Sequence, residues 1–412
     1  MARHIITALD VGTSTVETVV VERRPDEDKP HVLGVGFAPS AGLRRGIIVD
    51  IEDATSAIRK SVEEARRAAG VSIKSVWLAV GGAHISVSSS RGIVAVSRAD
   101  GEISSEDVRR AINAAETFIP KNPNREILHM IPRDFRVDSE AGVKDPVGMH
   151  GVRLEVDTLI IECSSPFLKN LIKCVEGAGL KVEDYVFSPL AAAEAVLTKR
   201  QKELGVVLLD IGGSTASFIV FEEGVPMHAG IIPIGGNHIT NDVAIGFRTQ
   251  VDIADRIKVA YGSCLPTELP KRESIRLAEF IPEETAMYSR KELGEIVEAR
   301  LGDIFELLQK ELKKINRAEL LPAGVVLTGG TSRMPGIIEF TKREMKLPVE
   351  IGNPFSFEGI LDAETLPSFS VALGIVGWAY AKNKEINMVS WKHHVMRVSK
   401  SPWMRWLKSL LP

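Results

Sequence analysis

Two short stretches with the same pattern decide the fold: Asp10-Val-Gly-Thr-Ser-Thr15 and Asp210-Ile-Gly-Gly-Ser-Thr215. They begin 200 positions apart, and each lies between an apolar stretch before it and another after it. This arrangement predicts two hairpins, each made of a strand, a tight turn of small residues and a returning strand. A pattern repeated at this distance indicates a chain built from two related halves.

Turns of this composition are suited to holding a phosphate. Glycine, serine and threonine bring backbone N–H groups and hydroxyls together at one point, where they can donate hydrogen bonds to phosphate oxygens. A single turn of this kind is most often an ordinary hairpin tip, but two copies in one chain favour a pair of phosphate contacts. Two such turns that face each other would grip a polyphosphate from both sides.

Further features extend this interpretation to a nucleotide. Asp10 and Asp210, each at the end of a buried strand, are placed to organise a Mg²⁺ ion through its waters, since Mg²⁺ prefers oxygen ligands. The stretch Gly324-Val-Val-Leu-Thr-Gly-Gly-Thr331 predicts a buried strand that ends in a glycine surface on which a flat base could pack. The sequence contains neither a GxxxxGKS or GxxxxGKT loop nor a GxGxxG that opens a βαβ unit. Any nucleotide is therefore expected in a clamp between two hairpins.

A helix over Asp252-Ile-Ala-Asp-Arg-Ile-Lys258 would carry an acid and a base on one face. Asp255 and Lys258 are three positions apart, so both side chains could reach a ribose. The same spacing is equally typical of a surface ion pair.

Composition narrows the classes of function. The 412 residues are 44% hydrophobic and 25% charged, which is typical of a globular protein and excludes collagen-like, mucin-like and wholly disordered chains. Lys and Arg number 51 against 54 Asp and Glu, so we expect no nucleic-acid partner. Three cysteines without CxxC spacing favour a reducing cytoplasm over a disulfide framework or a zinc cluster. No apolar run reaches the ~18 residues of a membrane span, so we expect neither a transmembrane helix nor a secretion signal.

The order of predicted elements indicates layered domains with additions. Helix followed by buried strand over 53–80 is typical of an α/β domain. Serine-rich strands, a helix from about residue 104 and frequent Pro and Gly set 85–162 apart as an inserted subdomain. A helical stretch over 239–261 and a long amphipathic helix over 290–316 predict a second peripheral subdomain.

The C-terminal segment differs from the rest of the chain. After Glu385 there is no acidic residue, whereas five Lys or Arg and three of the five tryptophans lie there. Wound as a helix, the segment has an apolar stripe with cations beside it, which is typical of helices that rest in a membrane interface. The alternative is a helix docked on its own protein. The residues expected to contact the membrane are Trp403, Arg405, Trp406, Leu407, Lys408, Leu410 and Leu411.

The two turns and Leu327-Thr-Gly-Gly-Thr331, in this order, resemble the phosphate-1, phosphate-2 and adenosine motifs of the actin, Hsp70 and sugar-kinase superfamily. The resemblance implies an α/β, actin-like fold of two related lobes with a nucleotide cleft between them. It implies ATP as cofactor, with Mg²⁺ held through water by Asp10 and Asp210, which would also be the catalytic carboxylates. Asp255 stands where glutamate is more usual, and it would reach less far. The other implied cofactor-binding residues are Gly12, Thr13, Ser14, Gly212, Gly213, Ser214, Thr215, Lys258, Gly329, Gly330 and Thr331.

Two longer stretches closely resemble the FtsA family of bacterial cell-division proteins. They are Glu126-Ile-Leu-His-Met-Ile-Pro-Arg-Asp-Phe-Arg-Val-Asp138 and Pro146-Val-Gly-Met-His-Gly-Val-Arg-Leu-Glu155, and the resemblance runs along essentially the whole chain. It implies a first lobe core of 1–84 and 163–190, interrupted by an FtsA-type inserted subdomain of 85–162. The second lobe would have a core of 191–236 and 321–382 and a peripheral subdomain of 237–320. A linker of 383–400 would then lead to an amphipathic membrane-targeting helix of 401–412.

The family implies a scaffold with at most weak ATPase activity. Such a protein self-associates into filaments at the cytoplasmic face of the cell membrane, binds its anionic surface, tethers the C-terminal peptide of FtsZ at the division site and recruits later division proteins. Glu194, between the halves, is where a water-positioning residue could lie. Within Glu298-Ala-Arg300, Arg300 resembles the contact for the FtsZ peptide, although an exposed solvated arginine has the same pattern.

Two other functions compete with this interpretation. A type IV pilus assembly protein like PilM shares the fold and the insert, but the amphipathic tail argues against it. A metabolic kinase of the same superfamily would need a substrate cleft with a catalytic carboxylate, and the sequence identifies none.

Overall fold

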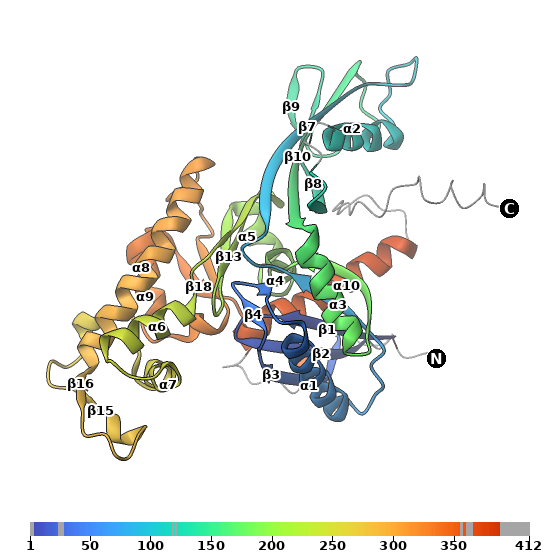
Figure 1. The fold of residues 1–412 in the computed structure, drawn as a ribbon. Coiled ribbons are helices and arrows are strands. Elements are labelled where there is room, and N and C mark those ends of the chain that lie inside the picture. Colours follow the sequence, from blue (N-terminus) through green and yellow to red (C-terminus); the bar gives the residue numbers. More distant parts are fainter. Residues whose placement is uncertain are drawn as a thin grey trace.

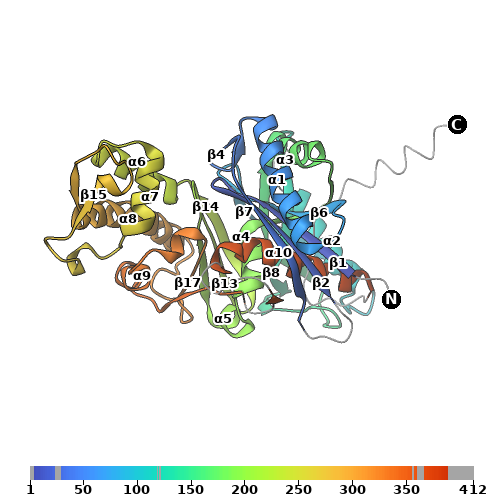
Figure 2. The ribbon, with the colours of Figure 1, turned by 90° about the horizontal axis from the view of Figure 1, so that it is seen from below.

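The computed structural model describes residues 4–23, 29–117, 119, 122–354, 357–359 and 366–387. Two lobes, each built on one mixed sheet, lie side by side and form the body of the molecule (Figures 1 and 2). The first sheet has the order β11 (Lys181–Phe187), β6 (Ser75–Val80), β1 (His4–Val11), β2 (Thr15–Arg23), β3 (His31–Pro39), β19 (Glu358–Gly359). The second has the order β14 (Val225–Ile232), β13 (Ala216–Glu222), β12 (Val206–Ile211), β17 (Val325–Thr328), β18 (Val349–Ile351).

The two sheets repeat one topology. In each, the strand before the glycine turn pairs antiparallel with the strand after it, as β1 does with β2 and β12 with β13. The returning strand pairs antiparallel with its successor, β3 or β14. On the other side two strands follow in parallel, β6 and β11 in one lobe and β17 and β18 in the other. The prediction of two related halves in an α/β, actin-like fold is therefore confirmed.

Helix α1 (Ile51–Ala69) covers one face of the first sheet. Asp50 caps its N-terminus by accepting a hydrogen bond from the N–H of Asp53, and Gly70 ends it in the left-handed conformation. Gly36 of β3 lets the helix lie directly on the strand, because a Cβ there would be 1.8 Å from the carbonyl oxygen of Ser61. Glycine at this position therefore allows the backbone of α1 to approach β3 more closely than any larger residue would.

Two small-residue helices pack between the lobes. They are α4 (Ser188–Val196) and α10 (Ser370–Asn387), which cross where a Cβ on Gly374 would lie 1.8 Å from the carbonyl oxygen of Ala191. Their apolar residues belong to the same core as Leu208 and Ile219 of the second sheet and most of the first sheet. Helix α10 continues to Asn387, so the first part of the expected linker is helical.

The segment after β6 forms a sheet of its own that projects from the body (Figure 1). Its order is β7 (Ser86–Ala95), β10 (Arg153–Ser164), β8 (Arg125–Val137), β9 (Glu140–Val143), with α2 (Ser105–Thr117) packed on it around a separate apolar core. The long strand β8 was not predicted, because it contains Pro132, next to which the ladder with β10 shifts register. Arg133 joins this sheet to the second lobe by donating a 2.7 Å hydrogen bond to the carbonyl of Met227 in β14.

The outer part of the second lobe is mainly helical. It contains α6 (Gly236–Gly246), α7 (Val251–Tyr261), the small sheet of β15 (Ser274–Arg276) and β16 (Met287–Ser289), and α8 (Arg290–Lys314), with α9 (Ile337–Met345) beside it. The prediction of one helical stretch from Ile239 to Tyr261 is wrong. Phe247 is fully buried and stacks on Tyr288, and Arg248 takes a positive φ of 49°, so the chain turns between α6 and α7.

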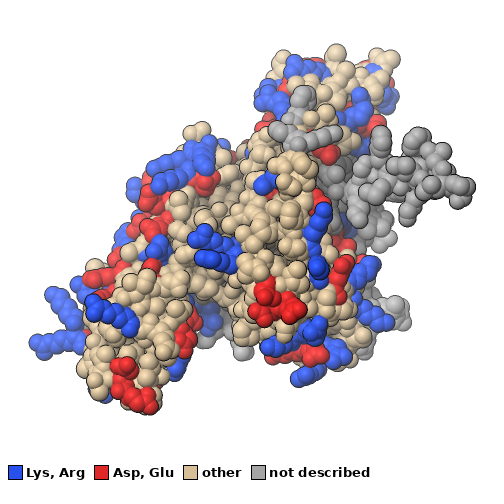
Figure 3. All heavy atoms as spheres, in the orientation of Figure 1, with Lys and Arg blue, Asp and Glu red and all other residues tan. Residues whose placement is uncertain are grey.

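On the face seen in Figure 3, Lys and Arg lie interspersed with Asp and Glu, as the near-balanced composition predicts. Across the part of the chain that is described, no helix is both long and apolar enough to cross a membrane. The expected membrane helix of 401–412, with all of its contact residues, lies outside the described residues.

Candidate functional site

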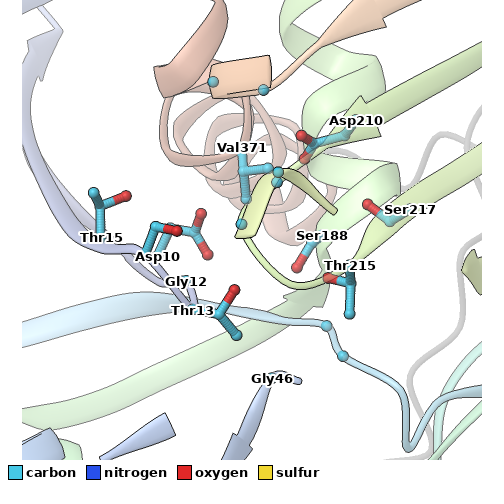
Figure 4. Close-up of a pocket in the computed structure, with 18 of the residues that line it drawn as sticks. Asp10, Gly12, Thr13, Thr15, Gly46, Ser188, Asp210, Thr215, Ser217 and Val371 are labelled. Atoms are coloured by element: carbon cyan, nitrogen blue, oxygen red, sulfur yellow. The ribbon is translucent and has the colours of Figure 1, made fainter. Parts of the chain in front are cut away.

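A cavity of about 550 Å³ opens where the two glycine turns meet. Figure 4 shows Asp10 and Thr13 on one side of it and Asp210 and Thr215 on the other. The structure thus brings together residues that are 200 positions apart in the chain. The predicted residues that line the cavity are Asp10, Gly12, Thr13, Ser14, Asp210, Gly212, Gly213, Thr215, Asp255, Lys258, Gly329, Gly330 and Thr331.

Both turns are closed by the same hydrogen bond. The N–H of Gly12 donates to the carbonyl of Thr15 over 2.9 Å, and the N–H of Gly212 donates to that of Thr215 over 3.0 Å. A Cβ on Gly12 would lie 2.8 Å from the carbonyl oxygen of Thr15, so this turn requires glycine. The shared pattern of the two stretches therefore specifies one local geometry twice.

The two turns touch across the cleft. The N–H of Ser214 donates to Oγ1 of Thr13 over 2.9 Å, and the hydroxyl of Ser14 donates to Oδ1 of Asn237 over 3.2 Å. A Cβ on Gly213 would be only 1.9 Å from Oγ of Ser14. Ser214 is thus at the site through its backbone, although it does not line the cavity itself.

The start of α6 supports the second turn from behind. Its first N–H groups, from Gly236 and Asn237, donate to the carbonyls of Gly212 and Gly213 over 2.9 and 2.6 Å. A Cβ on Gly235 would lie 2.5 Å from the carbonyl oxygen of Gly212, which excludes any larger residue there. Sequence reasoning missed these residues, and the pair Gly235-Gly236 was the available signal.

Besides Asp255, the cavity is lined by three further carboxyl groups, those of Asp10, Asp210 and Glu17. Burial, together with the charge of Asp210, raises the pKa of Asp10 to about 7, and burial raises that of Asp210 to about 6. Burial and the neighbouring carboxylates raise the pKa of Glu17 well above its ordinary value. Glu17 was not predicted, since its direction depends on the strand pairing that sets it directly opposite Asp10.

The carboxyl groups fit a hydrated Mg²⁺ ion better than a bare one. Over the described residues, no group of three His, Cys, Asp or Glu is arranged to hold a metal ion by itself. Mg²⁺ usually keeps several waters and takes one or two carboxylates plus phosphate oxygens. Asp10 and Asp210 would hold such an ion through water beside a polyphosphate.

Asp255 and Lys258 form an ion pair in the wall of the cavity. Nζ of Lys258 lies 2.6 Å from Oδ1 of Asp255, and the hydroxyl of Thr240 bonds to both groups. Burial would raise the pKa of Asp255, but the hydrogen bonds from Lys258 and Thr240 outweigh this and lower it. Nζ of Lys258 also lies 3.5 Å from the carbonyl oxygen of Gly236, so its three donors have acceptors and the free hydrogen-bonding capacity for a hydroxylated ligand lies on the carboxylate of Asp255. The ion-pair and ribose interpretations are therefore compatible.

The glycine surface, formed by Gly329 and Gly330, lies next to the end of β12, where the second turn begins. Gly329 has a φ of +84°, and a Cβ there would be 2.3 Å from Oδ1 of Asp210. At Gly330 the nearest atom to an added Cβ is the hydroxyl oxygen of Ser368, 4.0 Å away, so this side of the glycine pair is open. Arg333 and Met334, which sequence reasoning did not assign, also line the cavity.

Two predicted residues lie away from the cavity. Glu194, on α4, does not line it; its carboxylate instead pairs with Nζ of Lys202 over 2.7 Å, so this position does not support the water-positioning role. Arg300, on α8, is held by Asp242 of α6 through two hydrogen bonds of 2.6 and 3.0 Å and by Asp303 over 2.9 Å. It is therefore an already paired cation.

Comparison with solved structures shows the fold. The PilM-PilN type IV pilus biogenesis complex contains a chain with a TM-score of 0.64 at 18% identity, covering 90% of this chain and 97% of that one. MreB5 of Spiroplasma citri, solved with bound ADP, has a TM-score of 0.53 at 13% identity, covering 93% of this chain and 98% of that one. At these identities the likeness concerns architecture alone.

Comparison with protein families and curated proteins goes further. The model for cell division protein FtsA matches residues 207–374, and the model for the SHS2 domain inserted in FtsA matches residues 82–162. The cell division protein FtsA of Pseudomonas aeruginosa is 37% identical, covering 92% of this chain and 90% of that protein. The FtsA of Escherichia coli K12 is 32% identical over 99% of this chain and 98% of its own length. On this similarity along nearly its full length, the chain belongs to the FtsA family of cell division proteins.

Proposed function

We propose that the cleft binds ATP with Mg²⁺ and that the protein is an actin-like division scaffold, which polymerises at the cytoplasmic face of the cell membrane and tethers FtsZ there. The observation that carries the nucleotide part is the cavity between the lobes, lined on opposite sides by the two copies of the D-x-G-x-S-T turn. Family membership carries the role in division.

The wall of the cavity divides by chemistry. The two glycine turns offer N–H groups and hydroxyls for the phosphates, with Asp10 and Asp210 for the hydrated Mg²⁺. Asp255, held in place by Lys258, offers hydrogen bonds to the ribose, and the open side of Gly330 accepts the base. Glu194 pairs with Lys202 and is not assigned to water activation, and hydrolysis that is weak at most is part of the proposal.

The division of the chain into two lobe cores, an inserted subdomain at 85–162, a peripheral subdomain at 237–320, a linker and a C-terminal membrane helix is part of the proposal. The separate core around α2 supports the insert as a unit that could contact later division proteins and neighbouring copies. The amphipathic tail supplies the membrane contact, and filament formation multiplies the tails, so weak single contacts add up to firm attachment.

The FtsZ peptide is proposed to dock on the peripheral subdomain near Arg300. An incoming acidic peptide would have to compete with Asp242 and Asp303 for the guanidinium group. This contact is therefore expected to be an exchange of ion pairs and to weaken with salt.

Co-sedimentation with anionic vesicles tests the membrane part. The full chain is compared with a truncation that ends at Lys400, each with and without ATP and Mg²⁺, and with a full-length Trp403→Glu, Trp406→Glu variant. If only the unaltered full chain pellets with the vesicles, and more of it pellets with ATP, the result supports a membrane-bound filament. If all three proteins stay in solution, the tail is no anchor and a PilM-like role becomes the better interpretation.

A further inference from the structure

Glu17 is the one cleft carboxyl group that the motifs leave without a role. It lies on β2 directly opposite Asp10 of β1, and side chains of directly opposed residues project from the same face of an antiparallel pair. It is only 4% exposed, and it lines the cavity. Its Oε1 accepts a 3.2 Å hydrogen bond from the hydroxyl of Thr15, whereas its buried Oε2 has no hydrogen-bond partner.

Burying a carboxylate oxygen without a hydrogen-bond donor costs folding free energy. Such an oxygen therefore indicates that a bound ligand supplies the missing donor. Among the described residues, no cationic side chain donates a hydrogen bond to that oxygen. Of the described residues that line the cavity, the lysine and arginine are Lys258 and Arg333, and Lys258 is already bonded to Asp255 and Thr240. A polyphosphate without a cation would therefore meet three carboxyl groups where its own charge is highest.

We propose that Glu17 is a third carboxylate for the hydrated divalent cation, with its Oε2 accepting a hydrogen bond from a water of the ion, and that it makes nucleotide binding in this cleft dependent on that cation. The inference rests on the proposed nucleotide site and adds a selection to it: the cleft accepts the metal complex of a nucleoside triphosphate and discriminates against the free nucleotide. The crowding that raises the pKa of Glu17 agrees with this, because burial and the charges of Asp10 and Asp210 disfavour a further negative charge without a counter-ion.

The test is calorimetric titration of ATP into the full chain, once with excess Mg²⁺ and once with EDTA. The readout is the dissociation constant with EDTA divided by the dissociation constant with Mg²⁺. We expect this ratio to fall about tenfold or more in Glu17→Gln, since one negative charge near the cation is lost. Glu22→Gln is the matched control: Glu22 lies on the same strand, is also 4% exposed and does not line the cavity, so its ratio should equal that of the wild type.

The outcomes separate the inference from the proposed function. An unchanged ratio in Glu17→Gln, with ATP still bound, overturns the role of Glu17 and leaves the nucleotide site intact. Absence of ATP binding to the wild-type chain under both conditions overturns the site and this inference together. If Glu17→Gln does not fold, Glu17→Asp replaces it: drawing the carboxylate back by one methylene should weaken binding of the Mg²⁺ complex selectively, and an equal loss under both conditions overturns the proposal.

Discussion

The backbone N–H of Ser214 donates a 2.9 Å hydrogen bond to Oγ1 of Thr13, so the turns of the two lobes are joined directly across the cleft. N–H groups of such turns are the donors that a phosphate requires. Because this N–H already donates to Thr13, a phosphate that takes it as a donor would have to displace the hydroxyl of Thr13.

Replacing Thr13 by valine should loosen this junction. The variant keeps the shape of the side chain but removes the acceptor, so the amides of residues 212–215 should exchange hydrogen for deuterium faster when no nucleotide is added. Thr117→Val, which removes a hydroxyl bonded within α2, is the control and should leave these amides unchanged. Equal exchange in wild type and Thr13→Val would show that the bond does not hold the turns together.

Gly235→Ala should damage the second turn. The added Cβ would lie 2.5, 2.7 and 2.8 Å from backbone atoms of Gly212, Gly213 and Thr215, none of which can move without opening the turn. We expect a loss of about 1–3 kcal/mol in unfolding free energy and weaker ATP binding. In Gly302→Ala on α8 the Cβ meets nothing within 4 Å, so this control should be neutral or stabilising by up to ~1 kcal/mol. Thermal unfolding and calorimetry measure both effects, and normal ATP binding by Gly235→Ala would contradict the expectation.

Asp10→Asn should stabilise the protein while it removes binding of the Mg²⁺ complex of ATP. Because the folded-state pKa of Asp10 is raised to about 7, its ionisation opposes folding, and this penalty grows as the pH rises from the unfolded value near 4 through about 7. The gain in Tm should therefore be several degrees at about pH 8, on the order of 2 kcal/mol, and small at about pH 5. A gain that is the same at both pH values would show that the charge is not its origin.

Asp107 should make the inserted subdomain sensitive to acid. Burial opposes its ionisation, but hydrogen bonds from Ser104, Arg110 and the N–H of Ser97 outweigh burial and hold its pKa well below the usual range. Its stabilising effect is therefore present above the unfolded pKa near 4 and is lost as the pH falls below it.

Asp107→Asn is accordingly expected to lower the unfolding free energy by about 2 kcal/mol at neutral pH and by less under acid conditions. The exposed Asp100, changed to Asn in the same subdomain, should have a smaller effect. Urea unfolding, monitored by hydrogen–deuterium exchange of the amides in α2, measures the stability of both variants. If the two variants lose the same stability at every pH, the buried hydrogen bonds of Asp107 are not the cause.

Arg300 offers a test by release as well as by removal. If it contacts the FtsZ peptide, Asp242→Asn should raise peptide affinity severalfold, because it frees the guanidinium group from its bidentate partner. Arg300→Gln should lower the affinity, and both changes should shrink at high salt. Fluorescence anisotropy with a labelled peptide measures these affinities. If both variants bind the peptide with wild-type affinity, the peptide site does not include Arg300.

Local patterns carried much of the fold and part of the candidate site. The repeat could be predicted from the two D-x-G-x-S-T turns. Each turn is closed by a short-range hydrogen bond from a glycine N–H, that of Gly12 or Gly212, which the small residues of the pattern permit. Patterns of this kind could not foresee the break between α6 and α7, where the burial of Phe247 against Tyr288 decides the path of the chain. They also could not foresee β8, in which pairing with β10 outweighs the effect of Pro132.

The sequence by itself determined the two related halves, the order of the three glycine motifs and the family, because these depend on residue types at short, regular spacing. Only the tertiary structure decided which side chains meet in the cleft. Strand register turned Glu17 toward Asp10, and helix packing paired Glu194 with Lys202 and Arg300 with Asp242. Side-chain direction and partner are set by contacts between segments far apart in the chain, and no local pattern specifies those contacts.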